Sequence, residues 1–212
     1  MDGRNTATRI EILVFPGVDE LDALGPLEIL RNAQAFGAKF ETRLVTVEDH
    51  QEITGSHRLR FRPDALLAAD GRPDILVVPG GGWNTRSAEG AWSEAQRGVT
   101  PRAIARLHGE GAILASVCTG AMLVAAAGLA NNRHLTTHHQ ALAELQAAGA
   151  KVVEARVVDD GDIISVGGVT SGLDLGLYLV ERFASGEVAH KVAREMEYER
   201  RHAVWKQAER HA

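Results

Sequence analysis

A single cysteine, Cys118, stands where an apolar run gives way to small residues, in "AILASVCTGAML" (112–123). The apolar run predicts a strand and the small residues predict a helix, so Cys118 occupies the corner between them. A tight corner requires small residues two positions before and after it, and Ser116 and Gly120 supply them. This pattern is typical of a strand–nucleophile–helix turn, which presents the corner side chain to a substrate.

The position at a helix N-terminus predicts that Cys118 ionises readily, because the positive end of the helix dipole favours a thiolate. The alternative is that Cys118 is one more small buried apolar residue, as many free cysteines are. The spacing leaves both interpretations open.

A glycine-rich segment, "VPGGGW" (78–83), follows another predicted strand. Consecutive glycines allow backbone N–H groups to face a site without obstruction by side chains. An N–H of Gly81 or Gly82, together with the N–H of Thr119, would form an oxyanion hole. The alternative is a simple glycine-rich turn. A phosphate-binding loop is disfavoured, because neither G-x-G-x-x-G nor a terminal Lys-Ser/Thr is present.

Three carboxylates follow the first predicted strand, in "FPGVDELDALGP" (15–26): Asp19, Glu20 and Asp22. A carboxylate close to a thiolate can carry protons during catalysis. Alternatively, Asp22 caps a helix that begins at Ala23. The sequence does not rank the three acids.

Apolar runs at 9–15, 39–47, 74–78 and 112–117 predict strands, and periodic segments at 22–37, 91–109, 119–129, 140–149 and 171–186 predict helices. Gly98 and Pro101 are expected to divide the helix at 91–109, a peripheral strand or hairpin arm is expected at 52–63, and a hairpin is expected around Asp160-Gly161. A charged helix is expected from Glu187 to Ala212. Alternating strands and helices indicate a mainly parallel sheet covered on both faces, with functional groups at the carboxyl ends of its strands.

Composition excludes several classes of protein. The chain has 212 residues, 45% of them hydrophobic and 24% charged, with a net charge of −5, which suits one globular domain over 1–212. The charges are interspersed without a basic stripe, which argues against nucleic acid, and no apolar run reaches the roughly 20 residues of a membrane span. A lone cysteine and an N-terminus without a signal-peptide core predict a cytoplasmic protein.

His138 and His139, in "HLTTHH" (134–139), suggest a metal site or a catalytic base. Adjacent residues on a strand point to opposite faces, so the two histidines are not expected to serve one site. No zinc motif surrounds them. We expect a hydrogen-bonded structural role for both and no metal.

Four segments together resemble the ThiJ/PfpI superfamily of the class I glutamine amidotransferase-like fold: "FPGVDELDALGPLEIL", "DILVVPGGG", "ASVCTGAMLVAAAGLANNRHLTTHH" and "SVGGVTSGLDLGLYLVERF". They cover about 9–198 in order. Within the superfamily the chain is most similar to the isonitrile hydratase group. The resemblance implies a flavodoxin-like three-layer sandwich with a nucleophile elbow, no cofactor, and a homodimer.

The resemblance also implies roles for single residues. Cys118 matches the nucleophile, Asp22 the acid/base carboxylate, and Thr119 the threonine that hydratases require. Gly81 matches a glycine of the oxyanion or ligand pocket, and Gly172 a residue packed close to the site. Intracellular protease members carry His where this chain has Thr119, which disfavours proteolysis. Hydratases carry "THW" where this chain has "THH" (137–139), and a Pro-rich tail where it has "ERRHAVWKQ" (199–207), so the natural substrate is expected to differ.

These features predict a cysteine-dependent enzyme that adds water to a small-molecule isocyanide and yields an N-substituted formamide. Two alternatives stay open. One is another thiol enzyme, either an amidase or a glyoxalase-like activity on small carbonyls. The other is a redox or small-molecule sensor in which oxidation of Cys118 is the signal.

Overall fold

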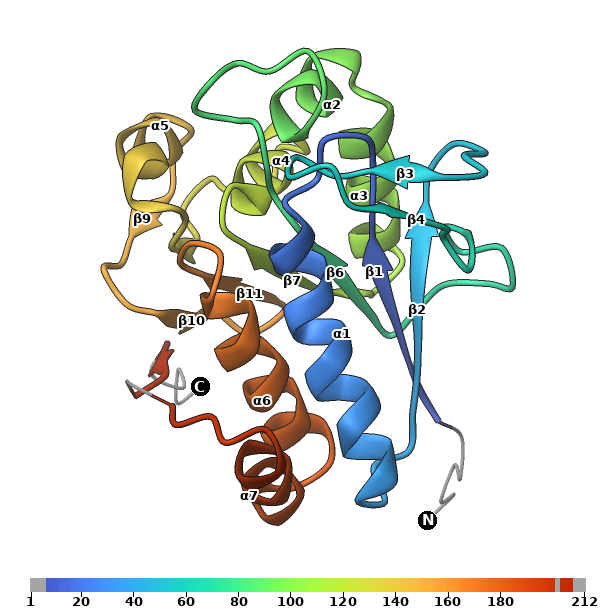
Figure 1. The fold of residues 1–212 in the computed structure, drawn as a ribbon. Helices are drawn as coiled ribbons and strands as arrows, with labels where there is room; N and C mark the ends of the chain where they lie inside the picture. The colour runs from blue at the N-terminus through green and yellow to red at the C-terminus, as the bar shows by residue number, and fades with distance from the viewer. Residues whose placement is uncertain (1–6, 201–202, 208–212) are drawn as a thin grey trace.

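An eight-stranded sheet forms the centre of the structure, a computed structural model that describes residues 7–200 and 203–207 (Figure 1). The strand order is β12-β10-β11-β7-β6-β1-β2-β5. All neighbouring strands are parallel except β10 and β11, so the predicted mainly parallel sheet is confirmed. The strands are β1 (Thr8–Leu13), β2 (Phe40–Thr46), β5 (Ala65–Leu66), β6 (Ile75–Val78), β7 (Ile113–Val117), β10 (Val157–Asp159), β11 (Ile163–Val166) and β12 (Trp205–Lys206).

Helices cover both faces of this sheet, as Figure 1 shows. One layer holds α1 (Glu20–Ala35), α6 (Ser171–Phe183) and α7 (Gly186–Glu195). The other holds α2 (Ala91–Arg97), α3 (Val99–Gly109) and α4 (Gly120–Ala126). The expected three-layer α/β sandwich is therefore confirmed. Because both faces are covered, all four residues of β6 are buried, and its unbroken "ILVV" reflects this position.

Several predicted turns are confirmed. The segment 52–63 forms the antiparallel pair β3 (Ile53–Thr54) and β4 (Arg60–Phe61). Asp160-Gly161 connects the antiparallel strands β10 and β11. Gly98, with a φ of 72°, ends α2 and precedes α3. Pro101 lies in the first turn of α3, where its missing N–H costs no hydrogen bond, so it does not break the helix.

A short parallel pair and two small helices complete the described chain. β8 (His134–Leu135) pairs with β9 (Lys151–Val152). Between them lie a one-turn 3-10 helix, η1 (His139–Ala141), and α5 (Leu142–Ala147), within the segment predicted as helical.

The predicted charged helix from Glu187 to Ala212 is wrong, because α7 ends at Glu195. Tyr198 donates a hydrogen bond to the buried Asp174 at 2.8 Å, which redirects the chain toward the sheet. Trp205–Lys206 then pairs in parallel with β10, and the Trp205 ring lies 4.9 Å from that of His134. Tertiary contacts thus outweigh local helical preference here. Residues 201–202 and 208–212 of the predicted helix lie outside the described residues.

Glycines allow α1 and α6 to pack closely. A Cβ on Gly176 would lie 2.7 Å from the Cβ of Ile29, and a Cβ on Gly172 would lie 3.1 Å from Pro26 Cδ. This packing places the first turn of α1 beside the N-terminus of α6, at the sheet edge where β7 ends. Across residues 7–200 and 203–207, the helices are too short or too polar to cross a membrane.

Candidate active site

The corner at Cys118 has the geometry that the sequence predicts. Cys118 follows β7 directly and has a φ of 54°, in the left-handed region that few non-glycine residues adopt. Gly120 must be glycine, because a Cβ there would lie 1.9 Å from the carbonyl oxygen of Val78. The side chain of Cys118 is not fully exposed as a free elbow would be, since only 5% of the residue is accessible.

Backbone contacts hold this strained corner in place. The Cys118 N–H donates to the Gly167 carbonyl at 2.9 Å, and the Cys118 carbonyl accepts from the Thr137 hydroxyl at 2.8 Å. Hydrogen bonds from the backbone of Val169 and Thr119 reach the thiol. Val169 is itself strained, with a φ of 37° that is unusual for a β-branched residue. Strain of this kind persists only where surrounding structure enforces it, and it gathers at functional sites.

Asp22 faces the thiol from the first turn of α1. The residue is 0% exposed, and its Oδ2 accepts the N–H of Gly80 at 2.9 Å. Its Oδ1 has no hydrogen-bond partner among the described residues, and the carboxyl interacts electrostatically with Cys118. Asp22 is not the helix cap that one interpretation predicted. Asp19 fills that role by accepting the Leu21 N–H at 3.3 Å.

Burial shifts the pKa of both groups upward. Desolvation, followed by the nearby charge of Asp19, raises the pKa of the Asp22 carboxyl well above its ordinary value. Desolvation, followed by the charge of Asp22, raises the pKa of the Cys118 thiol to about 12. These shifts oppose the expected effect of the helix dipole on Cys118, because loss of solvation disfavours the thiolate.

The two groups are coupled through their charges. A carboxylate at Asp22 repels a thiolate at Cys118, whereas a protonated Asp22 removes that repulsion and can donate a hydrogen bond to sulfur. The thiolate therefore forms most easily while Asp22 holds a proton. Formation of the Cys118 thiolate is therefore coupled to the protonation state of Asp22.

The glycine-rich segment contributes differently from the prediction. The Gly81 N–H donates to the Thr119 hydroxyl at 3.1 Å, so it is engaged rather than free to stabilise an oxyanion. Gly82 lies in the turn toward α2, where a Cβ would meet Glu89 and Ser87. Gly172 lies at the α1–α6 contact and does not line the pocket described below.

Gly80 is a site residue that sequence reasoning missed. Its N–H holds Asp22, and a Cβ at this position would lie 2.4 Å from the Thr119 hydroxyl. The signal in the sequence was its place as the first glycine directly after "VVP". Val169 was also missed, and nothing in the sequence indicates its strained conformation.

A pocket of about 670 Å³ opens beside the nucleophile. Three residues that hydrogen bond to Cys118 also line this pocket: Thr137, Gly167 and Val169. Other lining residues are Thr136, His138, His139, Leu142, Glu154, Ala155, Arg156, Gly168, Ser171 and Ala203. The pocket is large enough for a small organic substrate, and its wall is partly polar.

The two histidines of "TTHH" both line this pocket, contrary to the prediction that they point to opposite faces. They are not on a strand, because β8 ends at Leu135 and His138 precedes η1. Their rings lie 4.2 Å apart. The alternation rule failed here because it applies only to extended backbone.

Arg156 connects the pocket wall to the C-terminal segment. Its Nε lies 2.5 Å from the buried carboxylate of Asp174, and its Nη2 lies 3.3 Å from the Tyr198 hydroxyl. Ala203, beyond Tyr198, lines the pocket as well. The departure of the tail from the hydratase pattern therefore affects a wall of the pocket.

Asp19, Glu20 and His57 offer three possible metal ligands within 4.8 Å of one another. The oxygens of Glu20 are already engaged, because Oε1 accepts the N–H groups of His57 and Leu59 and Oε2 lies 2.8 Å from the His57 ring. These contacts attach the loop at 55–59 to α1, which accounts for the close approach of the three side chains.

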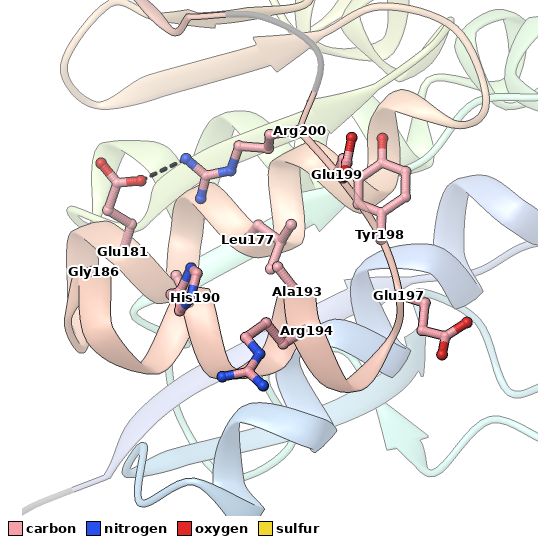
Figure 2. A pocket seen from close by; sticks show the side chains of 11 residues that line it. Leu177, Glu181, Gly186, His190, Ala193, Arg194, Glu197, Tyr198, Glu199 and Arg200 are labelled. Atoms are coloured by element: carbon pink, nitrogen blue, oxygen red, sulfur yellow. Dashed lines mark hydrogen bonds and ion pairs between the residues drawn. The ribbon is translucent and has the colours of Figure 1, made fainter.

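A second pocket, of about 720 Å³, lies between α6, α7 and the segment 197–200 (Figure 2). Arg200 and Glu181 form an ion pair there at 2.5 Å, and His190 and Arg194 extend from α7. Among the residues that the structure describes, its lining contains no cysteine and shares no residue with the pocket beside Cys118.

Comparison with known protein families gives a match that agrees with this site and with the sheet that carries it. The profile of the DJ-1/PfpI family matches residues 8–182. The chain belongs to the DJ-1/PfpI family.

Individual members differ in function. Isonitrile hydratase of Pseudomonas putida is 31% identical over 91% of this chain and 79% of its own length. The Parkinson disease protein 7 homolog of Danio rerio is 24% identical over 87% of this chain and 94% of its own length. A crystal structure of a ThiJ/PfpI family protein from Pseudomonas syringae matches with a TM-score of 0.81 and 27% identity, over 92% of this chain and 77% of that one. The family match thus establishes the fold and leaves the activity to be inferred from the site.

Proposed function

We propose that this member of the DJ-1/PfpI family is a cysteine-dependent enzyme that hydrates isocyanides to N-substituted formamides. The observation that carries the proposal is the fully buried carboxyl of Asp22, which has a raised pKa, interacts with Cys118 and has an Oδ1 without a hydrogen-bond partner in the described part of the chain. An isocyanide carbon accepts a nucleophile and then a proton. Cys118 supplies the nucleophile and Asp22 supplies the proton. The similarity to isonitrile hydratase supports the same chemistry.

In the first step the sulfur of Cys118 bonds to the terminal carbon of the isocyanide. The electron pair that develops on this carbon takes the proton held by Asp22, while Asp22 accepts the proton that leaves the thiol, which gives a thioimidate, R–N=CH–S–Cys118. Asp22 is protonated again after this exchange, and it retains its hydrogen bond from the Gly80 N–H at 2.9 Å.

In the second step water adds to the thioimidate carbon. Asp22 accepts a proton from this water as it gives its own proton to the imine nitrogen, which leaves the adduct R–NH–CH(OH)–S–Cys118. Collapse of this adduct breaks the C–S bond, passes the hydroxyl proton to the sulfur, and releases R–NH–CHO from the regenerated Cys118 thiol. The raised pKa of Asp22 suits it to both proton transfers, because it is protonated when the cycle begins and again when it ends.

The test is formamide production from cyclohexyl and aryl isocyanides by the purified, thiol-reduced protein. We expect turnover by the natural protein and none above background by Cys118→Ala. Formamide formed equally by Cys118→Ala, or by neither protein, would refute the proposal.

The alternative of a redox sensor predicts a reactive thiolate in the resting protein. Burial instead raises the pKa of the Cys118 thiol to about 12, and only 5% of the residue is exposed. These observations favour a nucleophile that is activated by a bound substrate and by Asp22. Slow reaction of the free protein with hydrogen peroxide is the expected result, and mass spectrometry would detect oxidised Cys118.

We further infer that the protein acts as a homodimer. Two large apolar side chains, Leu21 on α1 and Leu59 before β4, are 40% and 46% exposed. Both adjoin the same attachment point, because Glu20, next to Leu21 in the chain, accepts the Leu59 N–H at 3.2 Å. We expect light scattering to show a dimer, and Leu21→Glu to shift it toward a monomer.

A further inference from the structure

His138 occupies a position that determines where its ring carries a proton. It precedes η1, and its Nδ1 accepts the backbone N–H of Gln140 at 3.3 Å. A backbone amide can only donate, so Nδ1 must offer its lone pair. In the neutral ring the proton is then on Nε2, as the hydrogen-bond network assigns it.

Asn84 adds a second contact at the same nitrogen. It lies in the loop that follows β6, and its amide nitrogen is 3.3 Å from Nδ1 of His138. The same nitrogen donates to the side-chain oxygen of Gln140 at 3.1 Å, which orients the amide with its N–H groups toward the histidine. Two donors therefore converge on Nδ1, one from η1 and one from a loop far away in the sequence.

The opposite edge of the ring faces the pocket wall. A Cβ on Gly168 would lie 2.7 Å from Cδ2 of His138 and 3.5 Å from Nε2. Gly168 stands between Gly167 and Val169, both of which contact Cys118. Among the described residues, Nε2 of His138 has no hydrogen-bond or ion-pair partner, so its N–H is free to donate to a molecule in the pocket.

The surroundings of this ring favour its neutral form. Burial and then the charge of His139 lower the pKa of His138, and the charge of Asp19 acts weakly in the opposite direction. Arg156 and Glu154 are the other charged groups that line the pocket. Arg156 is already paired with Asp174, so it is not an unneutralised cation waiting for an anion.

We propose that Asn84 is a positioning residue that holds His138 with its proton on Nε2, and that this N–H binds a neutral oxygen acceptor on the substituent of the substrate. The inference rests on the proposed function, because it assigns a substrate class to the same site: isocyanides whose substituent carries an ester, ether or amide oxygen. Asp22 and Cys118 make and break the bonds of the reaction. The role that we assign to His138 is recognition of the substituent of the substrate.

The first test compares methyl isocyanoacetate with n-butyl isocyanide, which has the same chain length and lacks the oxygens. We expect the ratio of their kcat/KM values to fall about tenfold in His138→Phe relative to the natural protein, the effect of one lost hydrogen bond. His138→Gln, whose amide reaches a similar position, should restore most of the ratio. Comparing ratios between proteins cancels the intrinsic reactivity of the two isocyanides.

The matched control is His139→Phe, which alters the neighbouring ring of the same pocket. We expect it to leave the ratio close to that of the natural protein. An equal fall in both variants would mean that the ratio follows general pocket polarity, and would overturn the role of His138.

The second test needs no turnover. Long-range proton–nitrogen NMR of histidine-labelled protein should show Nδ1 of His138 without a proton and Nε2 with one, and Asn84→Asp, which places an acceptor beside Nδ1, should increase the fraction of rings that carry a proton on Nδ1. In Cys118→Ala, added N-formylglycine methyl ester should shift the Nε2 resonance. A protonated Nδ1 in the natural protein, or no shift with the ester, would overturn the inference. A shift without isocyanide turnover by the natural protein would refute the proposed function alone.

Discussion

Two buried acids, Asp22 and Glu11, show how differently this fold treats a carboxyl group. Both are almost inaccessible, at 0% and 1% exposure. Glu11, on β1, is paired with Arg9 at 3.3 Å and Arg43 at 3.7 Å and also accepts the Ala68 N–H at 2.8 Å. Asp22 has one backbone donor, a thiol and a neighbouring acid, Asp19, and none of the cations among the described residues contributes to its environment.

The difference separates structure from chemistry. Glu11 is compensated, as a buried charge in a stable protein must be. Asp174 follows the same pattern, since Arg156 and Tyr198 both contact it. Asp22 is left without compensation, which costs stability and produces a carboxyl that holds its proton. An uncompensated acid beside a strained cysteine is the combination expected of a catalytic site.

The largest effect that would sharpen this comparison is on turnover. Asp22→Asn preserves shape and removes the proton donor, so kcat/KM for isocyanide hydration should fall about 10²–10⁴-fold. Steady-state kinetics measures this, with circular dichroism to verify folding. Turnover within twofold of the natural protein would show that the uncompensated acid is not used.

The reverse experiment replaces the compensated acid. Glu11→Gln removes a charge that two arginines require, so the free energy of unfolding should fall by about 1–3 kcal/mol. Urea denaturation measures it. The kcat/KM per folded molecule should not change, since Glu11 is not among the residues that line the pocket beside Cys118. A loss of activity larger than the loss of folded protein would show that Glu11 also contributes to catalysis, and would contradict the distinction between Glu11 and Asp22.

The pH dependence of stability gives a third comparison. Because the folded pKa of Asp22 is raised above its ordinary 3.8, its contribution favours folding below about pH 4 and is lost as pH rises toward the folded pKa. Asn does not titrate, so the stability of Asp22→Asn relative to Asp22 should increase with pH, by at most about 1.4 kcal/mol per pH unit. Urea titrations in a Cys118→Ala background avoid the thiol. A difference that decreases with pH would contradict the raised pKa.

The smallest expected effect concerns Asp174. Tyr198→Phe removes one of its donors and leaves Arg156 in place, so the free energy of unfolding should fall by about 1 kcal/mol. Thermal denaturation would detect this change. A much larger loss would indicate that the C-terminal segment detaches from the pocket wall as a unit.

Many local features of the fold could be predicted from the sequence alone. Unbroken apolar runs such as "ILVV" predicted the buried parallel strands, and Asp160-Gly161 predicted the β10–β11 hairpin. Ser116, Cys118 and Gly120 predicted the corner after β7, because only small neighbours permit it. These are local properties, since backbone conformation and side-chain periodicity depend on residues close in the chain.

The chemistry of the site was decided by tertiary structure. Asp22 meets Gly80 across a separation of 58 residues, and His138 meets Asn84 across 54. Burial, the absence of a compensating cation, the strained Val169 and the tautomer of His138 all arise from such contacts. The C-terminal segment shows the same limit, because its charged pattern predicted a helix while Tyr198 and Trp205 bind it to the sheet. A pKa or a proton position depends on every group packed around an atom, and only folding brings those groups together.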